Sequence, residues 1–257
     1  MATIPTGRFV WFEYLSGSKD PAKAQGFFGE LFNWRTQAMP VPGGGSYTMI
    51  AAGSDTIGGY PPAEMLKNAP PHAHWLSHLQ VADTNAIVAK VKSLGGRVLS
   101  EPHTMEMGTH TIVADPLGGA FALWQPAKAE GGGDWRGVDN QFCWNELFTE
   151  DPAKSVAFYK AIGGFEEEKL EMGPMTYHIL KSDGKPRAGV TKPMMPGVPQ
   201  SWLPYVQVAN VDATHDKANK LGASIKVPPT DIPNVGRFSI LADPLGASLG
   251  ILQPKRG

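Results

Sequence analysis

Residues 11–23 read WFEYLSGSKDPAK, and residues 144–154 read WNELFTEDPAK. Both stretches contain a tryptophan, a glutamate two positions later and an Asp-Pro-Ala-Lys tetrapeptide. Asp is a favoured N-cap and Pro a favoured first residue of a helix, so each stretch predicts a strand that leads into a helix. The recurrence indicates that the chain is a tandem duplication.

Further matches follow in the same order along the chain. They are Trp75-Leu76 with Trp202-Leu203, Gln80-Val81-Ala82 with Gln207-Val208-Ala209, and Asp115-Pro116-Leu117-Gly118 with Asp243-Pro244-Leu245-Gly246. A glycine triplet in a polar setting separates the two copies and is typical of a flexible linker. We therefore predict a first domain at residues 1–127, a linker at 128–139 and a second domain at 140–257.

Each domain is predicted to contain two βαβββ modules. Helices are expected at residues 21–32 and 83–94, and at equivalent places near 152–162 and 212–221. A strand should precede each helix and short strands should follow it. Because one module cannot bury both a helix face and a sheet face alone, the modules should pair. The predicted fold is α+β, with four modules paired into two tandem half-barrel domains.

Composition narrows the range of functions. The chain has 257 residues, of which 42% are hydrophobic, and its 23 Lys and Arg nearly balance its 24 Asp and Glu. A nucleic-acid-binding protein normally carries a basic surplus, so we expect no nucleic-acid partner. Cys143 is the sole cysteine, which excludes an intramolecular disulfide. No signal peptide or membrane helix is visible, so a cytoplasmic protein without a membrane partner is expected.

The module pattern resembles a known superfamily. A strand before Asp, a helix with an aromatic pair such as Phe27-Phe28, and a late Asp-Pro-x-Gly hairpin are similar to the vicinal oxygen chelate proteins. That group contains glyoxalase I, bleomycin-resistance proteins and extradiol dioxygenases. Pro196-Gly197-Val198-Pro199, Trp202 and the stretch 231–238 resemble its two-unit, glyoxalase-like branch. The resemblance implies paired modules that form cup-like sheets with the binding site inside.

The resemblance also implies positions for metal ligands, on the first and last strands of the modules. These positions fall on Trp11, Leu76, Ala122, Trp144, Leu203 and Gly250. A divalent cation prefers imidazole, carboxylate or thiolate ligands, which none of these residues offers. The sequence therefore predicts no metal and no other cofactor.

Side-chain alternation along the strands identifies other residues that should face into the cups. The candidate catalytic residues are Glu13, His78, Glu146 and Tyr205. The candidate ligand-binding residues are Trp11, Trp124, Trp144, His110 and His178. Each glutamate is either a general base or ligand anchor, or a structural carboxylate that binds nearby backbone. Each histidine is either part of a site or a hydrogen-bonded residue of the sheet.

Two classes of function remain open. The preferred hypothesis is a protein that binds a small, planar or amphipathic molecule in an aromatic-lined cup. The alternative is a lyase, isomerase or hydroxylase that uses Glu13 and His78 for proton transfer. In that alternative, Glu13, His78 and His110 supply the two histidines and one carboxylate that hold one divalent metal in the first domain. Since the chain already carries both halves of each cup, we expect a monomer or a loose homodimer.

Overall fold

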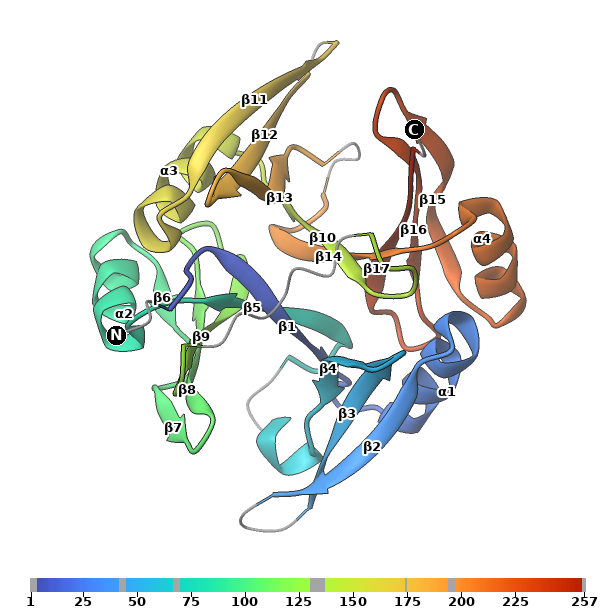
Figure 1. Cartoon of the computed structure of the whole chain (residues 1–257), viewed down its shortest axis with the longest axis horizontal. Helices are drawn as coiled ribbons and strands as arrows, with labels where there is room; N and C mark the ends of the chain where they lie inside the picture. Colours follow the sequence, from blue (N-terminus) through green and yellow to red (C-terminus); the bar gives the residue numbers. More distant parts are fainter. Residues whose placement is uncertain are drawn as a thin grey trace. The chain divides into compact units, whose positions relative to one another are not determined.

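The computed structural model describes residues 4–41, 45–66, 70–129, 137–173, 175–193 and 197–255 (Figure 1). Residues 130–136 of the predicted linker lie outside the described residues. The helices are α1 (Pro21–Phe32), α2 (Thr84–Ser93), α3 (Pro152–Gly163) and α4 (Val211–Lys220), with a short 3-10 helix at Ala63–Leu66. All four predicted α-helices are therefore present.

The strands follow the four-module pattern. Module 1 contains β1 (Arg8–Leu15), β2 (Arg35–Pro40), β3 (Ser46–Ala52) and β4 (Asp55–Tyr60). Module 2 contains β5 (His74–Gln80), β6 (Arg97–Val98), β7 (His103–Met105), β8 (Gly108–Ala114) and β9 (Ala120–Pro126). Module 3 contains β10 (Phe142–Phe148), β11 (Glu166–Met172), β12 (Met175–Ser182) and β13 (Lys185–Thr191). Module 4 contains β14 (Ser201–Gln207), β15 (Ser224–Ile232), β16 (Gly236–Ala242) and β17 (Ser248–Pro254).

Hydrogen bonding joins these strands into two sheets. The first has the order β2-β3-β4-β1-β5-β9-β8-β6, with β7 beside β8, and the second has the order β11-β12-β13-β10-β14-β17-β16-β15. In each module the first strand pairs in parallel with the last, as β1 does with β4 and β5 with β9. The predicted α+β class, with four βαβββ modules in two half-barrel sheets, is confirmed.

Helix caps explain where each helix begins. The side chains of Asp20, Asp83, Asp151 and Asn210 accept hydrogen bonds from backbone N–H groups in the first turn of α1, α2, α3 and α4. Such a bond satisfies a donor that has no partner inside the helix. The Asp-Pro pairs recognised in the sequence therefore mark the true starts of α1 and α3.

The chain forms two compact units that each combine segments from both halves of the sequence. Unit 1 comprises Met1–Trp11, Leu76–Asp134 and Trp144–Leu203, and unit 2 comprises Phe12–Trp75, Trp135–Cys143 and Pro204–Gly257. Unit 1 thus contains most of modules 2 and 3, and unit 2 most of modules 1 and 4. Within unit 1, α2 contacts α3, and within unit 2, α1 contacts α4.

Buried hydrogen bonds connect the modules inside each unit. In unit 1, the hydroxyl of Tyr159 donates to Asp115 over 2.8 Å and accepts from the indole N–H of Trp202 over 2.9 Å. In unit 2, the hydroxyl of Tyr14 donates to Asp243 over 2.5 Å. Both aspartates begin the duplicated Asp-Pro-Leu-Gly turns, so the turn that closes one module also anchors the neighbouring one.

Candidate functional site

Two histidines of unit 1 lie on one face of the β5-β9-β8 ladder. His78 on β5 is paired with Ala122 on β9, and His110 on β8 is paired with Trp124 on β9. Because Ala122 and Trp124 are two residues apart, all four side chains share a face. The two imidazole rings have centroids 5.1 Å apart. His78 is only 3% exposed, whereas His110 and Trp124 are half-buried.

A small residue lies opposite the buried imidazole. Ala122, one of the positions where the family resemblance implies a metal ligand, is opposite His78 in the register of β5 and β9. The equivalent pair in unit 2 is Tyr205 and Gly250. There a Cβ on Gly250 would lie 2.2 Å from the Tyr205 ring, so only glycine admits that ring. In both ladders, a ring from the first strand lies beside a small residue on the last strand.

Glu13 occupies the equivalent place on β1 in unit 2. Glu13 is half-buried and lies between the buried residues Phe12 and Tyr14. The hydroxyl of Tyr47 on β3 donates to its Oε1 over 2.8 Å. Its register partner on β4 is Gly59, where a Cβ would lie 2.2 Å from the Tyr47 ring. The carboxylate is therefore held by a specific donor from a neighbouring strand.

Glu13, His78 and His110 form a candidate metal centre. Each offers one ligand atom, and these atoms all lie within 4.8 Å of one another. Two imidazoles and one carboxylate form a set that binds divalent iron and similar cations. The prediction of no cofactor is therefore wrong, and the alternative of one divalent metal in the first domain is the one that the structure favours.

The error has a simple geometric origin. The family resemblance placed ligands at Trp11 and Leu76, whose side chains cannot bind a metal. Glu13 and His78 lie two residues further along the same strands. A shift of two residues keeps a side chain on the same face of a strand. A metal ligand two residues further along a strand therefore faces the same side as the position that the resemblance implies. Considering only the implied positions overlooks such a ligand.

The second Glu–Tyr pair lies in unit 1. The hydroxyl of Tyr177 on β12 donates to Glu146 Oε1 over 2.7 Å and accepts from the Trp144 indole N–H over 2.9 Å. Burial raises the pKa of Tyr177 well above its ordinary value, and the charge of Glu146 raises it further. The phenol therefore stays protonated and serves as a donor to the carboxylate. The structure thus brings the predicted residues Trp144 and Glu146 together through Tyr177.

His178 lies on the other face of the same sheet. Its register partner is Val190, which pairs with Leu147, whereas Glu146 pairs with Gly189. The imidazole Nδ1 of His178 is 2.8 Å from Glu167 Oε1. Burial raises the pKa of Glu167, but the hydrogen bond to His178 and the charges of nearby lysines together lower it by more. The net shift of this pKa is therefore downward. The geometry therefore does not bring His178 together with Glu146.

The remaining predicted residues are placed as follows. Trp11 is half-buried on β1 and, being two residues from Glu13, projects from the same face of that strand. Tyr205 is 5% exposed and covers Gly250. Roles for these two residues and for the other predicted site residues stay predictions.

Sequence reasoning missed Tyr47 and Tyr177, the hydroxyl donors to the two glutamates. A signal for them exists in the sequence. Tyr47 precedes Gly59 by 12 residues, and Tyr177 precedes Gly189 by 12 residues. Because β3 and β12 carry little other sequence similarity, this spacing stands out only after the partner glycines are known to lie beneath the rings.

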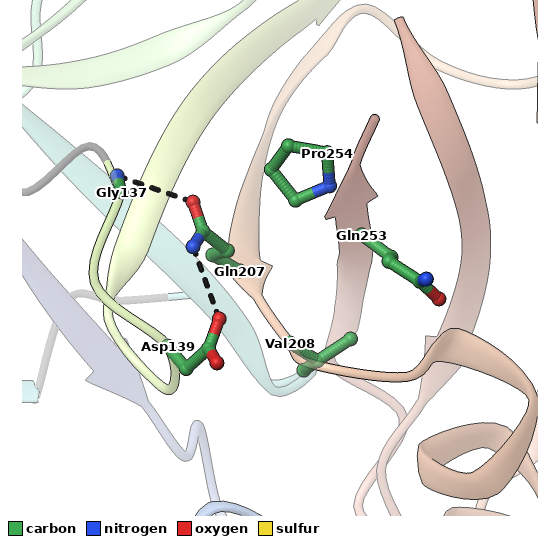
Figure 2. Close-up of a pocket in the computed structure, with 6 residues that line it drawn as sticks. All are labelled: Gly137, Asp139, Gln207, Val208, Gln253 and Pro254. Carbon is green, nitrogen blue, oxygen red and sulfur yellow. Dashed lines mark hydrogen bonds between the residues drawn. The ribbon is translucent and has the colours of Figure 1, made fainter. Parts of the chain in front are cut away.

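A separate pocket in unit 2 does not contain the candidate site (Figure 2). It encloses about 320 Å³ and is lined by Gly137, Asp139, Gln207, Val208, Gln253 and Pro254. The Gln207 side chain accepts from the Gly137 N–H and donates to Asp139, as Figure 2 shows. Gln253 accepts from the Val211 N–H at the start of α4. These polar groups connect chain segments, and none of the predicted site residues lines the pocket.

Comparison with known proteins identifies the family of this chain. Residues 13–123 and 141–251 each match the Glyoxalase/Bleomycin resistance protein/Dioxygenase superfamily. The chain belongs to this superfamily and contains two copies of its domain. Within the described residues, no helix is long and apolar enough to cross a membrane.

Similar proteins carry several names. A protein of Mycobacterium bovis named as a glyoxylase, CFP32, is 35% identical over 240 residues, which cover 91% of each chain. The anthracycline biosynthesis protein DnrV of Streptomyces peucetius is 28% identical over 272 residues, which cover 100% of this chain and 97% of that protein. The same superfamily membership is therefore compatible with different activities.

Solved structures share the fold at low sequence identity. The Mn(II)-bound glyoxalase of Novosphingobium aromaticivorans has a TM-score of 0.64 and 16% identity, with 97% of this chain and 82% of that chain covered. The 2,2',3-trihydroxybiphenyl 1,2-dioxygenase of Sphingomonas wittichii has a TM-score of 0.65 and 12% identity, with 96% and 90% covered. At these identities the comparison establishes the fold.

Proposed function

We propose that this protein binds one divalent cation through Glu13, His78 and His110 and uses it to hold a small molecule with neighbouring oxygen atoms. The observation that carries the proposal is the convergence of three ligand atoms within 4.8 Å of one another. The Mn(II)-bound glyoxalase with the same fold supports a metal in this setting.

The side chains of Glu13, His78 and His110 are of types that bind divalent cations. Neutral imidazole and carboxylate are both common ligands of divalent transition metals. His78 is almost fully buried, so a cation bound by its ring would lose much of the screening by water. When bound, the metal would act as a Lewis acid that polarises an oxygen of the ligand.

The surroundings favour a flat ligand. Trp124 is paired with His110 in the β8-β9 register and is half-buried on the same face. An indole ring offers a large apolar surface against which a planar molecule can stack. Two of the relatives are named for anthracycline biosynthesis, and anthracyclines contain fused planar rings with oxygen substituents. We therefore propose a planar aromatic molecule rich in oxygen as the ligand.

Glu13 can act either as a metal ligand or as a general base, and these two roles correspond to different classes of reaction. As a metal ligand, the Glu13 carboxylate would help to hold the cation. As a general base, it would instead take a proton next to a carbonyl, as a lyase or isomerase requires. The three convergent ligand atoms support the first role.

Ligand binding with and without metal tests the proposal. Alizarin, a planar anthraquinone with neighbouring hydroxyl groups, would be titrated into the protein while tryptophan fluorescence is followed. We expect saturable quenching with Mn(II) and at least about tenfold weaker binding after the metal is removed or in His110→Ala, since one lost ligand or charge-assisted contact is worth about 1.5–3 kcal/mol. His72→Ala, an exposed histidine, is the matched control.

The opposite result would support the metal-free hypothesis. If removal of metal leaves the affinity for alizarin unchanged, the aromatic cup binds its ligand without a cation. The protein would then act as a binding protein of the kind that the sequence first suggested.

A further inference from the structure

The Glu–Tyr hydrogen bond is built twice in this chain. Tyr47 on β3 donates to Glu13 on β1, and Tyr177 on β12 donates to Glu146 on β10. In each case the glutamate lies on the first strand of a module and the tyrosine on the third. The two copies have distances of 2.8 and 2.7 Å. The contact therefore occurs in the first module of each half of the duplicated chain.

Glycines hold the two tyrosine rings in place. A Cβ on Gly59 would lie 2.2 Å from Cε1 of Tyr47, and a Cβ on Gly189 would lie 1.8 Å from Oη of Tyr177. Glycine inside a strand often marks such a close approach. Any other residue at either position would displace the ring and its hydroxyl. In modules 1 and 3, a glycine therefore provides the space that one tyrosine ring occupies.

Only the first copy is joined by histidines in a candidate metal centre. Glu13 belongs to the group with His78 and His110, and no second group of three such residues occurs in the part of the chain that the structure describes. The hydroxyl of Tyr47 donates to Glu13 Oε1 and so restrains the orientation of the carboxylate group. Hydrogen bonds to a ligating carboxylate orient it and affect metal affinity.

We propose that Tyr47 is a positioning residue that orients the Glu13 carboxylate as a metal ligand. Gly59 contributes to this role, because the absence of a Cβ leaves space for the Tyr47 ring. This inference rests on the proposed function, because it requires a cation at Glu13, His78 and His110. The copy at Glu146 has the same hydrogen bond without the two histidines, so it offers a matched control within the same molecule.

The test measures the affinity of the full-length protein for Mn(II). Free Mn(II) gives a strong paramagnetic resonance signal, so its loss on titration reports binding. We expect Tyr47→Phe to weaken Mn(II) binding by about 10- to 100-fold, the usual effect of removing a partner of a metal ligand. Tyr177→Phe should leave the affinity within about twofold, because local effects at separate sites rarely couple.

A second pair of variants displaces the tyrosine rings without removing their hydroxyl groups. Gly59→Ala should displace Tyr47 and weaken Mn(II) binding in the same direction as Tyr47→Phe. Gly189→Ala makes the equivalent clash with Tyr177 and should leave Mn(II) binding near that of the wild type. Thermal melts of the metal-free variants separate the roles, since a purely structural tyrosine would affect the melt and not the Mn(II) signal of the folded protein.

The outcomes distinguish the inference from the proposed function. Equal affinity of the wild type and Tyr47→Phe for Mn(II) would contradict the positioning role and leave the metal site standing. Equal losses in Tyr47→Phe and Tyr177→Phe would also contradict it, since they would show a general effect on the fold. If the wild type binds no Mn(II), the proposed function fails and the inference fails with it.

Discussion

Asp243 and Tyr14 show how single side chains in this protein combine burial with charge. Asp243 is 3% exposed, and Tyr14 is 1% exposed. Burial raises the pKa of Asp243, and hydrogen bonds from Tyr14 and the backbone amides of Ala247 and Leu245 offset only part of that rise. Burial and the charge of Asp243 also raise the pKa of Tyr14, so its hydroxyl keeps its proton and donates.

The raised pKa of Asp243 predicts a pH effect with a definite sign. The folded state holds this proton more tightly than the unfolded state, where the pKa is about 3.9. The free energy of unfolding should therefore fall as the pH rises from that value through the raised folded pKa. Asp243→Asn has no such proton to lose.

Urea denaturation from pH 3 to 8 would measure this effect. The unfolding free energy of the wild type, measured relative to that of Asp243→Asn, should decrease as the pH rises. A difference that is constant across this range would show that Asp243 does not titrate differently in the two states.

At the same scale, the sequence predicted the candidate site incompletely. Glu13, His78 and His110 can be predicted from the sequence as an alternative metal set, since strand alternation indicates which residues share a face. The preferred prediction was nevertheless that no metal binds, because the positions implied by the family resemblance hold no metal-binding side chain. Tyr47 was missed because its contact with Glu13 depends on the register of β3 with β4, which residue types alone do not specify.

Among the elements, the helices were predicted well and the edge strands poorly. The Asp-Pro pairs are local signals, so the starts of α1 and α3 could be predicted. The βαβββ pattern predicts three strands after α1, but the sequence does not indicate the residues of β2, because all six are exposed and show no alternation of apolar side chains. β7 has the same property over three residues. Hydrogen bonds to a neighbouring strand, rather than a hydrophobic pattern, define such strands.

The cap of α3 provides an element-scale prediction. Asp151→Ala removes the side-chain acceptor for the Lys154 N–H, a bond of 3.0 Å. We expect a loss of about 0.5–2 kcal/mol in unfolding free energy, the usual cost of removing a helix N-cap. Urea denaturation measures the loss, with Lys154→Ala as a control that changes an exposed side chain and keeps the cap. A loss in Asp151→Ala no larger than that of the control would contradict the capping role.

For the whole molecule, the two units cut across the duplicated halves of the sequence. Unit 1 combines segments of modules 2 and 3, and unit 2 combines segments of modules 1 and 4. The buried bonds from Tyr159 to Asp115 and from Tyr14 to Asp243 lie within these units and join residues from opposite halves. The duplication was visible in the sequence, whereas this exchange of partners required the structure. The predicted limits of the tandem domains stay a prediction.

This arrangement predicts that the halves depend on each other. A fragment of residues 1–129 would lose the partners of Asp115 and Tyr14 and expose the helix faces that α3 and α4 cover. Buried polar groups without partners cost about 1–3 kcal/mol each, so we expect no cooperative unfolding of this fragment alone. Mixing it with residues 130–257 should restore a cooperative transition in calorimetry. A fragment 1–129 that unfolds cooperatively at the temperature of the whole chain would contradict the prediction.

The central claim is that Glu13, His78 and His110 bind one divalent cation. The most direct measurement is the metal content, by elemental mass spectrometry, of protein purified without chelators or nickel affinity and then dialysed against Mn(II). We predict about one equivalent per chain in the wild type and in His72→Ala, since three ligands of this kind define one site. His78→Ala and Glu13→Ala should lose it. No metal in the wild type, or equal metal in all four proteins, would contradict the claim.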